Sequence, residues 1–275
     1  MQKLSKRYSP TALETYLQCP FQFFALRTLK LERIPRRAED RLNALVQGGI
    51  IHSVIAQWHA TRQPVDSIFD RVFQDACQKE AIPSCYRTAL LRHRMLQDLR
   101  ALVADTQMPP AFDSLAEQAF EWELQPGTMI SGRIDRLDKL PGGRAVVVDY
   151  KYSLRLKERL KNENFLQGPL YLLALEHLYG LDPAGMVFCS PRGGEVTYAG
   201  WGEITGLKLR PFTREWMQAA ALKAIQAAGE IAAGRIAPHP FVLDPCRYCE
   251  VRDVCRYETS ARTLVAIGAS VAVDS

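Results

Sequence analysis

The chain has 275 residues, 47% of them hydrophobic, which is enough for one large domain or two small ones with a sizeable core. A net charge of +5 favours a polyanionic partner only mildly, because the 35 basic residues are dispersed. The chain has no apolar run of about 18 residues and no N-terminal signal region, which argues against a membrane or exported protein and favours a cytoplasmic one. In such a chain, seven cysteines favour metal or cluster ligation over disulfides.

The first third of the sequence is predicted to be helical. A helix begins at Ser9, whose hydroxyl precedes a proline in the first turn, and Glu14 is expected to complete the cap. Pro20 is expected to break or bend this helix directly after Cys19. A helical subregion over about residues 36–110 is then predicted from a charged loop at 33–41, a helix from near Leu42 or Gly49, and one or two helices within 66–105.

From Leu115 the hydrophobic period changes to two, which predicts a strand. The later elements are a hairpin, a helix at 162–181, strands at 186–189 and 195–198, and a long Ala-rich helix at 211–234. This order predicts an α/β fold in which a mixed sheet, within about residues 115–235, is packed by helices. One domain is expected over residues 1–275, with a flexible tail at 264–275 and a region of metal-binding cysteines at 244–257.

The hairpin consists of two β-rich runs that flank a Pro-Gly-Gly breaker centred near Gly142. Residues i and i+2 of a strand share a face, so Asp149 and Lys151 are expected to point the same way and Tyr150 the other way. With the turn at Gly142, Asp135 lies roughly opposite Asp149. Two carboxylates and one ammonium group therefore converge at one spot.

Close carboxylates repel each other unless a cation lies between them, and hard oxygen ligands suit Mg²⁺ or Mn²⁺. The alternative is that Asp135 and Asp149 are ordinary exposed strand charges. That alternative is weaker here, because the apolar run 146–148 is suited to a buried strand, which rarely ends in a charged pair. The basic segment 151–161 follows directly, and it forms either a solvated helix face or a contact to a phosphate backbone.

Three cysteines near the C-terminus, Cys246, Cys249 and Cys255, have a C-x₂-C-x₅-C spacing that lets them reach one metal centre. Cys19 is the best candidate for a fourth ligand, because the following proline places its thiolate at a helix break. The spacing is equally consistent with a structural Cys₄ zinc site and with an iron–sulfur cluster. The other cysteines, Cys77, Cys85 and Cys189, are interpreted as small buried hydrophobic residues.

Six segments in the right order carry a resemblance to a known family: the N-terminal helix 9–24, Gly48 to His52 (G-x-x-x-H), Gly132 to Asp135 (G-x-x-D), Asp149 to Lys151 (D-x-K), Gln167 to Tyr171 (Q-x-x-x-Y), and the clustered cysteines. The chain resembles the PD-(D/E)XK nucleases of the RecB/AddB type, in particular the branch of CRISPR-adaptation-like nucleases with an iron–sulfur cluster. The resemblance implies a restriction-endonuclease-like fold with a helical N-terminal insertion.

The resemblance also implies roles for individual residues. Asp135 and Asp149 would hold Mg²⁺ or Mn²⁺ with His52 and the backbone carbonyl of Tyr150 as further ligands. Lys151 would orient or activate the attacking water and stabilise charge on the phosphorane. Gln167 and Tyr171 would help to position the DNA strand. A structural 4Fe–4S cluster would be held by Cys19, Cys246, Cys249 and Cys255, and it would staple the N- and C-terminal regions together.

The leading hypothesis is a metal-dependent exonuclease acting on single-stranded or end-processed DNA, in recombination repair, CRISPR adaptation or phage defence. The second is a nuclease-fold DNA-binding or scaffolding subunit that serves a helicase or a CRISPR-adaptation protein. A third is a zinc-stapled domain with unrelated chemistry. The sequence contains no helicase P-loop, so unwinding would have to come from elsewhere. The Met1 start and the short lead into the first helix favour a free-standing polypeptide.

Overall fold

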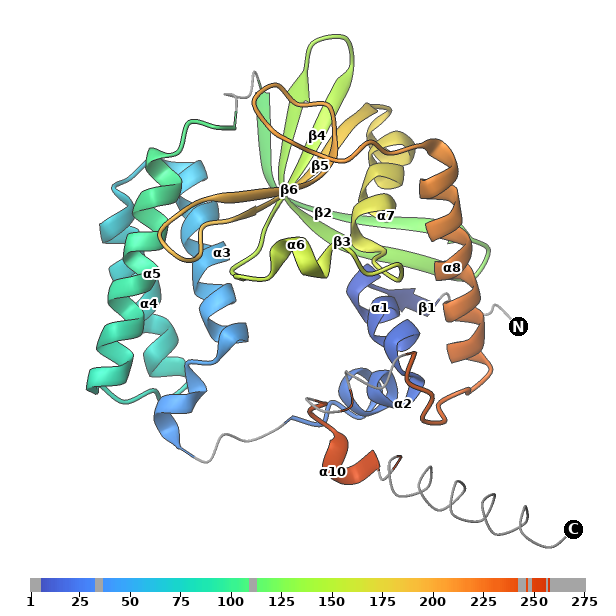
Figure 1. Cartoon of the computed structure of the whole chain (residues 1–275), viewed down its shortest axis with the longest axis horizontal. Coiled ribbons are helices and arrows are strands. Elements are labelled where there is room, and N and C mark those ends of the chain that lie inside the picture. The colour runs from blue at the N-terminus through green and yellow to red at the C-terminus, as the bar shows by residue number, and fades with distance from the viewer. Residues whose placement is uncertain are drawn as a thin grey trace, which may run out of the picture.

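The computed structural model describes residues 6–32, 37–108, 113–241, 246, 249–255 and 257. Within these residues, one mixed sheet lies between a lobe of helices α3, α4 and α5 on one side and helices α7 and α8 on the other (Figure 1). The strands are β1 (Lys6–Tyr8), β2 (Asp113–Gln125), β3 (Thr128–Leu140), β4 (Arg144–Tyr150), β5 (Asp182–Ser190) and β6 (Thr197–Gly202). The predicted mixed sheet flanked by helices is therefore confirmed.

The helices cover the sheet and also form a group at its foot, where α1, α2 and α10 lie close together in Figure 1. Their bounds are α1 (Pro10–Gln18), α2 (Pro20–Phe23), α3 (Ala44–Thr61), α4 (Val65–Lys79), α5 (Tyr86–Ala104), α6 (Leu156–Arg159), α7 (Gln167–Ala174), α8 (Arg214–Ala232) and α10 (Arg252–Cys255). Two π-helical segments, Phe24–Thr28 and Leu175–Tyr179, extend α2 and α7. No helix in the described part of the chain is both long and apolar enough to cross a membrane.

Several predicted boundaries need correction. The helix expected at 162–181 is α-helical only from Gln167 to Ala174, and the helix expected at 211–234 begins at Arg214, where Thr213 caps it. Part of the loop expected at 33–41 is a 3₁₀ helix, Ala38–Arg41, and residues 33–36 lie outside the described residues. The tail 264–275 also lies outside them. Both helices start later than predicted, since a hydrophobic pattern locates an element more reliably than it locates its first residue.

The predicted hairpin register is confirmed. Strands β3 and β4 pair in an antiparallel way with Arg136 opposite Val148, and the same register carried one step further places Asp135 beside Asp149. Along one edge of β3, β4 pairs with residues 136–140 and β1 pairs with residues 128–130. Asp135 therefore lies in the stretch of β3 between these two partners, at the end of β4.

Alternation along β4 separates two hydrophobic clusters. Ala145 and Val147 pack into the cluster that includes residues of α1, α7 and α8, whereas Val146, Val148 and Tyr150 pack into the cluster that includes residues of α3, α4 and α5. Because side chains alternate along a strand, Asp149 falls on the α7 side of the sheet. The buried apolar residues on both faces of β4 thus fix the direction in which its last carboxylate points.

Candidate functional site

The two predicted carboxylates lie close together at the end of β4. Asp149 is only 2% exposed, and the side chain of Asp135 is 12% exposed. The Asp135 carboxylate accepts a hydrogen bond of 2.8 Å from the backbone N–H of Tyr150, directly after Asp149. This bond ties the side chain of one strand to the backbone of the other, so the sheet itself determines the separation of the two acids.

Lys151 and Gln167 converge on the buried carboxylate. Lys151 Nζ lies 2.6 Å from Asp149 Oδ2, and Gln167 Nε2 donates a hydrogen bond of 2.6 Å to Asp149 Oδ1. Burial raises the pKa of Asp149 above its ordinary value; the Lys151 charge opposes this shift, and the Asp135 charge adds to it. The site is therefore a buried acid pair with an ammonium group against it.

His52 reaches the same site from α3. Its Nδ1 lies 3.2 Å from Asp135 Oδ2, the same oxygen that accepts the hydrogen bond from the backbone N–H of Tyr150. Burial lowers the pKa of His52, but the hydrogen bond and the charge of Asp135 outweigh it, so the net pKa is raised. Helix α3 thus delivers an imidazole to the Asp135 carboxylate.

Tyr171 lies one turn after Gln167 on α7 and is also buried. Its hydroxyl donates to the carbonyl of Arg133 at 3.1 Å, and its ring packs edge-on against Phe120. A Cβ added at Gly132 would lie 2.7 Å from the Phe120 ring and 3.0 Å from the Tyr171 hydroxyl. The glycine of the G-x-x-D segment is therefore required by close packing beside the site.

The opposite face of β4 carries a second polar network that the sequence patterns did not reveal. The Tyr150 hydroxyl lies 3.0 Å from Nε2 of His59, on the side of the sheet opposite to Asp149. Burial, together with the charges of Arg136 and Arg62, lowers the pKa of His59 to about 4, so this imidazole is neutral near pH 7. Nearby, Arg136 makes a two-pronged ion pair with the buried Asp138, with both N–O distances at 2.7 Å.

A third network fixes the turn after β5. Asp98 of α5 is buried and accepts hydrogen bonds from the Tyr152 hydroxyl at 2.7 Å and from the amides of Gly193 and Gly194 at 3.1 and 2.8 Å. The guanidinium of Arg192 lies 4.8 Å from the Tyr152 ring centre and donates to the Tyr152 carbonyl at 3.3 Å. This network holds Arg192 against Tyr152, the residue that follows Lys151; Arg192 and the segment 152–161 are called the rim below.

The residues around the acid pair fit a divalent cation by their donor chemistry. In the described part of the chain, Gln167 Oε1 is buried without a hydrogen-bond partner, and the buried Asp149 Oδ2 is met only by the Lys151 ammonium. Buried oxygens of this kind are costly unless a cation or water meets them. Across the described residues, however, no three His, Cys, Asp or Glu side chains are grouped closely enough to hold a metal ion as they stand. In this arrangement Lys151 supplies the positive charge that Asp149 contacts.

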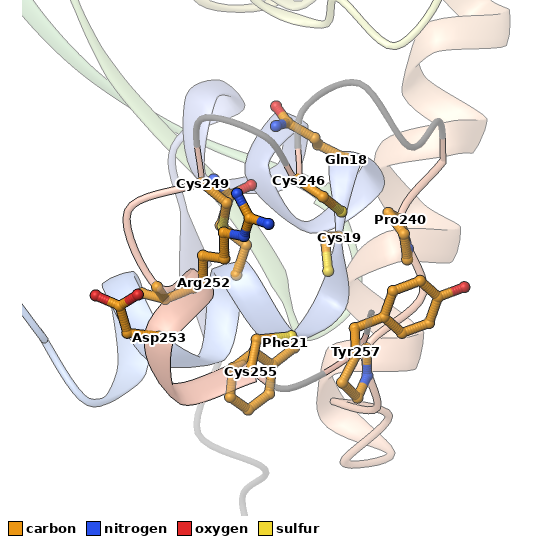
Figure 2. Close-up of a pocket in the computed structure, with 13 residues that line it drawn as sticks. Gln18, Cys19, Phe21, Pro240, Cys246, Cys249, Arg252, Asp253, Cys255 and Tyr257 are labelled. Atoms are coloured by element: carbon orange, nitrogen blue, oxygen red, sulfur yellow. The ribbon is translucent and has the colours of Figure 1, made fainter. Parts of the chain in front are cut away.

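The four predicted cysteines line one cavity of about 310 Å³ at the foot of the molecule. Figure 2 shows Cys19, at the break between α1 and α2, on the same cavity as Cys246, Cys249 and Cys255 from the C-terminal segment. Burial raises the pKa of Cys255, and nearby Cys19 and Cys249 raise it further, so these thiols are within electrostatic reach of one another. Residues 244, 245, 247, 248 and 256 of the predicted region lie outside the described residues.

The other three cysteines are separate from this cavity lining. Cys189 is buried on β5, as predicted, and burial raises its pKa to about 12. Cys77 and Cys85 are only partly buried, so they are less buried than predicted, although Cys77 packs against the hydrophobic cluster of the α3–α5 lobe as a small hydrophobic residue would. Both lie at the ends of the helices of the α3–α5 lobe, where an element terminus is partly open to solvent.

Comparisons with known proteins supply a family. Residues 7–256 match the family model described as the PD-(D/E)XK nuclease superfamily. One matching solved structure is entitled "Crystal structure of SSO0001"; the match covers 92% of this chain and 87% of that one, at 13% sequence identity and a TM-score of 0.44. A similarity of that size carries no argument about function. No curated protein matches the chain.

Proposed function

Since the chain belongs to the PD-(D/E)XK nuclease superfamily, whose members are generally metal-dependent nucleases, we propose that it is a Mg²⁺- or Mn²⁺-dependent deoxyribonuclease. The observation that carries the proposal is the convergence of Asp135, Asp149 and Lys151 at the end of β4. We further propose that it acts as an exonuclease on single-stranded or end-processed DNA, in recombination repair, CRISPR adaptation or phage defence.

Asp135, Asp149 and His52 are the side chains that would hold the ion, with the backbone carbonyl of Tyr150 as a further ligand. A divalent ion bound there lowers the pKa of a water molecule and neutralises charge at the phosphorus. The Lys151 ammonium, held against Asp149, is placed to orient the attacking water and to stabilise charge on the phosphorane. Gln167 and Tyr171 are buried, so we assign them to orienting Asp149 and β3, which positions the DNA strand indirectly.

Basic residues at the rim support a polyanionic substrate. Arg192 is held beside Tyr152, and Arg155, Lys157 and Lys161 are exposed on the segment that follows Lys151. Positive side chains on one border of an active site attract and orient a phosphate backbone without reading its sequence. We therefore propose that DNA approaches the acid pair across this rim.

The cysteine cavity supports a structural centre. Four thiols with the donor chemistry of a Cys₄ site line it, and we propose that they hold a 4Fe–4S cluster that joins α1 to the C-terminal segment. Two hydrogen bonds already link these parts, from Phe241 N to the Gln18 carbonyl at 2.9 Å and from the Tyr16 hydroxyl to the Arg235 carbonyl at 2.9 Å. The reducing cytoplasm, where thiols persist, is the compartment we propose for such a chain.

One observation favours a second candidate, a DNA-binding or scaffolding subunit of a helicase–nuclease or CRISPR-adaptation complex. No three metal-binding side chains are grouped for an ion in the described residues, and Lys151 contacts Asp149 instead. A subunit of this kind would bind DNA without Mg²⁺ or Mn²⁺ and would cleave none of the substrates offered.

The deciding experiment is digestion of end-labelled single-stranded, blunt and nicked DNA with Mg²⁺, with Mn²⁺ and with a chelator. We expect metal-dependent release of nucleotides from ends, and we expect Asp149→Ala and Lys151→Ala each to slow it by about 100-fold or more. The control is Asp66→Asn, which changes an exposed acid paired with Arg100 and should leave DNA digestion at the parent rate. Asp98→Asn is not a suitable control, because Asp98 holds the turn that carries Arg192. Equal digestion by the parent and by Asp149→Ala would refute the assigned site.

A further inference from the structure

Helix α7 carries both Gln167 and Tyr171, yet the chain before it supplies no capping side chain. The residue at its N-cap is Leu166, which has no polar group that could accept from the first turn. The first backbone N–H groups of an α-helix have no partner within the helix, and when partly buried they need an acceptor from elsewhere. The position of Gln167, the first residue of α7, therefore depends on a group outside the local sequence.

That group is Glu14 of α1. Its Oε1 accepts hydrogen bonds of 2.8 Å from the backbone N–H of Leu166 and of 2.8 Å from that of Gln167. The carboxylate comes from 152 residues earlier in the sequence than Leu166. A negative charge at a helix N-terminus is also favoured by the helix dipole, so Glu14 provides both acceptor and charge.

The contact continues from the backbone of Gln167 to the acid pair. Gln167 is 4% exposed, and its side-chain amide donates to Asp149 Oδ1 at 2.6 Å. Asp149 in turn lies against Lys151. A shift at the start of α7 would therefore move the amide that orients the buried carboxylate. Glu14 itself touches none of the reacting groups in these contacts.

We propose that Glu14 is a positioning residue for the nuclease site, acting through the first turn of α7 and Gln167 on Asp149. The inference rests on the proposed function, and it extends that function to a residue in the N-terminal helix. Without the Glu14 carboxylate, two partly buried N–H groups lose their acceptor, and the first turn of α7 unwinds or shifts.

The test compares Glu14→Ala, Glu14→Gln and Gln167→Ala with the double variant E14A/Q167A in metal-dependent DNA digestion. We expect Glu14→Ala to lower kcat by about 10- to 100-fold with little change in KM, as for other residues that orient a site from behind. Glu14→Gln keeps an acceptor oxygen and should recover most of the rate. The double variant should be no slower than Gln167→Ala alone, because the two residues act as one unit.

Thr213→Ala is the matched control, because Thr213 caps the neighbouring helix α8 by accepting from Trp216 N at 3.2 Å. It should lower the melting temperature about as much as Glu14→Ala while leaving kcat near that of the parent. Additive losses in E14A/Q167A, or equal loss of kcat in Thr213→Ala, would overturn the inference.

Hydrogen exchange separates this inference from the proposed function, since it needs no DNA. The amides of Leu166 and Gln167 should exchange faster in Glu14→Ala and at the parent rate in Thr213→Ala. Unchanged exchange at these two amides would overturn the role of Glu14 even if the enzyme is active. A parent chain that digests no DNA would overturn the proposed function, and the exchange rates would still decide whether Glu14 holds α7.

Discussion

The acid pair and the cysteine cavity are built in different ways. At the acid pair, strand register and the hydrogen bond from Tyr150 N to Asp135 hold the two carboxylates side by side, and Lys151 and Gln167 both contact Asp149. At the cavity, one thiol from a helix break and three from the C-terminal segment line a space of about 310 Å³. The protein alone organises the first site, whereas the second has its donors spread around a space that a bound centre would fill.

Helix α1 connects the two regions. Glu14 lies in its second turn and caps α7, and Cys19 stands at its C-terminal end on the cavity. Ser9 caps α1 itself through a 3.1 Å hydrogen bond from Ala12 N. A structural centre at the cavity would therefore stabilise a helix that also supports the acid pair. The two regions are thus coupled through α1, although each can be changed separately by mutation.

The largest expected effect comes from removing metal. A chelator that strips Mg²⁺ or Mn²⁺ should reduce DNA digestion to background and leave the melting temperature nearly unchanged, because the strands and Lys151 hold the acid pair without an ion. Re-adding the metal should restore the rate. A large fall in melting temperature on mild chelation, with the cysteine centre intact by absorbance, would contradict the idea that the sheet organises this site.

Next in size is the loss of a cavity cysteine. Cys249→Ser and Cys255→Ser should lose bound iron and visible colour and should unfold more easily by several kcal/mol, on the order of a structural metal's contribution to folding. The matched control is Cys85→Ser, outside the cavity lining, which should keep both iron and melting temperature. Iron content, zinc content and thermal melting of each variant measure these effects. A colourless parent protein with stoichiometric zinc would show that the four cysteines hold zinc and not an iron–sulfur cluster.

A smaller effect is expected from filling the space at Gly132. An added methyl group would lie 2.7 Å from the Phe120 ring, so Gly132→Ala should cost about 1–3 kcal/mol in the free energy of unfolding. The methyl group would also press on the Tyr171 hydroxyl, so kcat should fall together with the stability. Gly49→Ala is the control: it meets nothing within 4 Å in α3, so it should be neutral or stabilise by up to about 1 kcal/mol. Urea unfolding measures both.

The smallest effect is expected at the rim. Arg192→Ala should weaken DNA binding to a similar degree for all sequences and reduce the slope of binding against salt by about 1, as for one phosphate contact. The charge-matched control is Arg7→Ala, because Arg7 is an exposed arginine of β1 that pairs with Glu121 of β2 and is not part of the rim. Fluorescence anisotropy over a salt series measures both variants. An unchanged salt slope in Arg192→Ala would remove this arginine from the proposed DNA path.

The sequence by itself determined the parts of this protein that depend on neighbours in the chain. Period-two hydrophobicity and the turn at Gly142 predict the hairpin, and with it the meeting of Asp135 and Asp149. The Ser9 cap and the break at Pro20 follow equally from local chemistry. Patterns of this kind act over a few residues, so they can be recognised without knowing the fold.

Only the tertiary structure decided which distant groups complete these local elements. Glu14 was expected to cap its own helix, but it caps α7, 152 residues away. Asp98, on the predicted helical region, holds the turn that carries Arg192, and His59 meets the hydroxyl of Tyr150. Such partners are chosen by the packing of helices against the sheet, and a carboxylate's local sequence carries no record of which unsatisfied N–H group the folded chain brings to it.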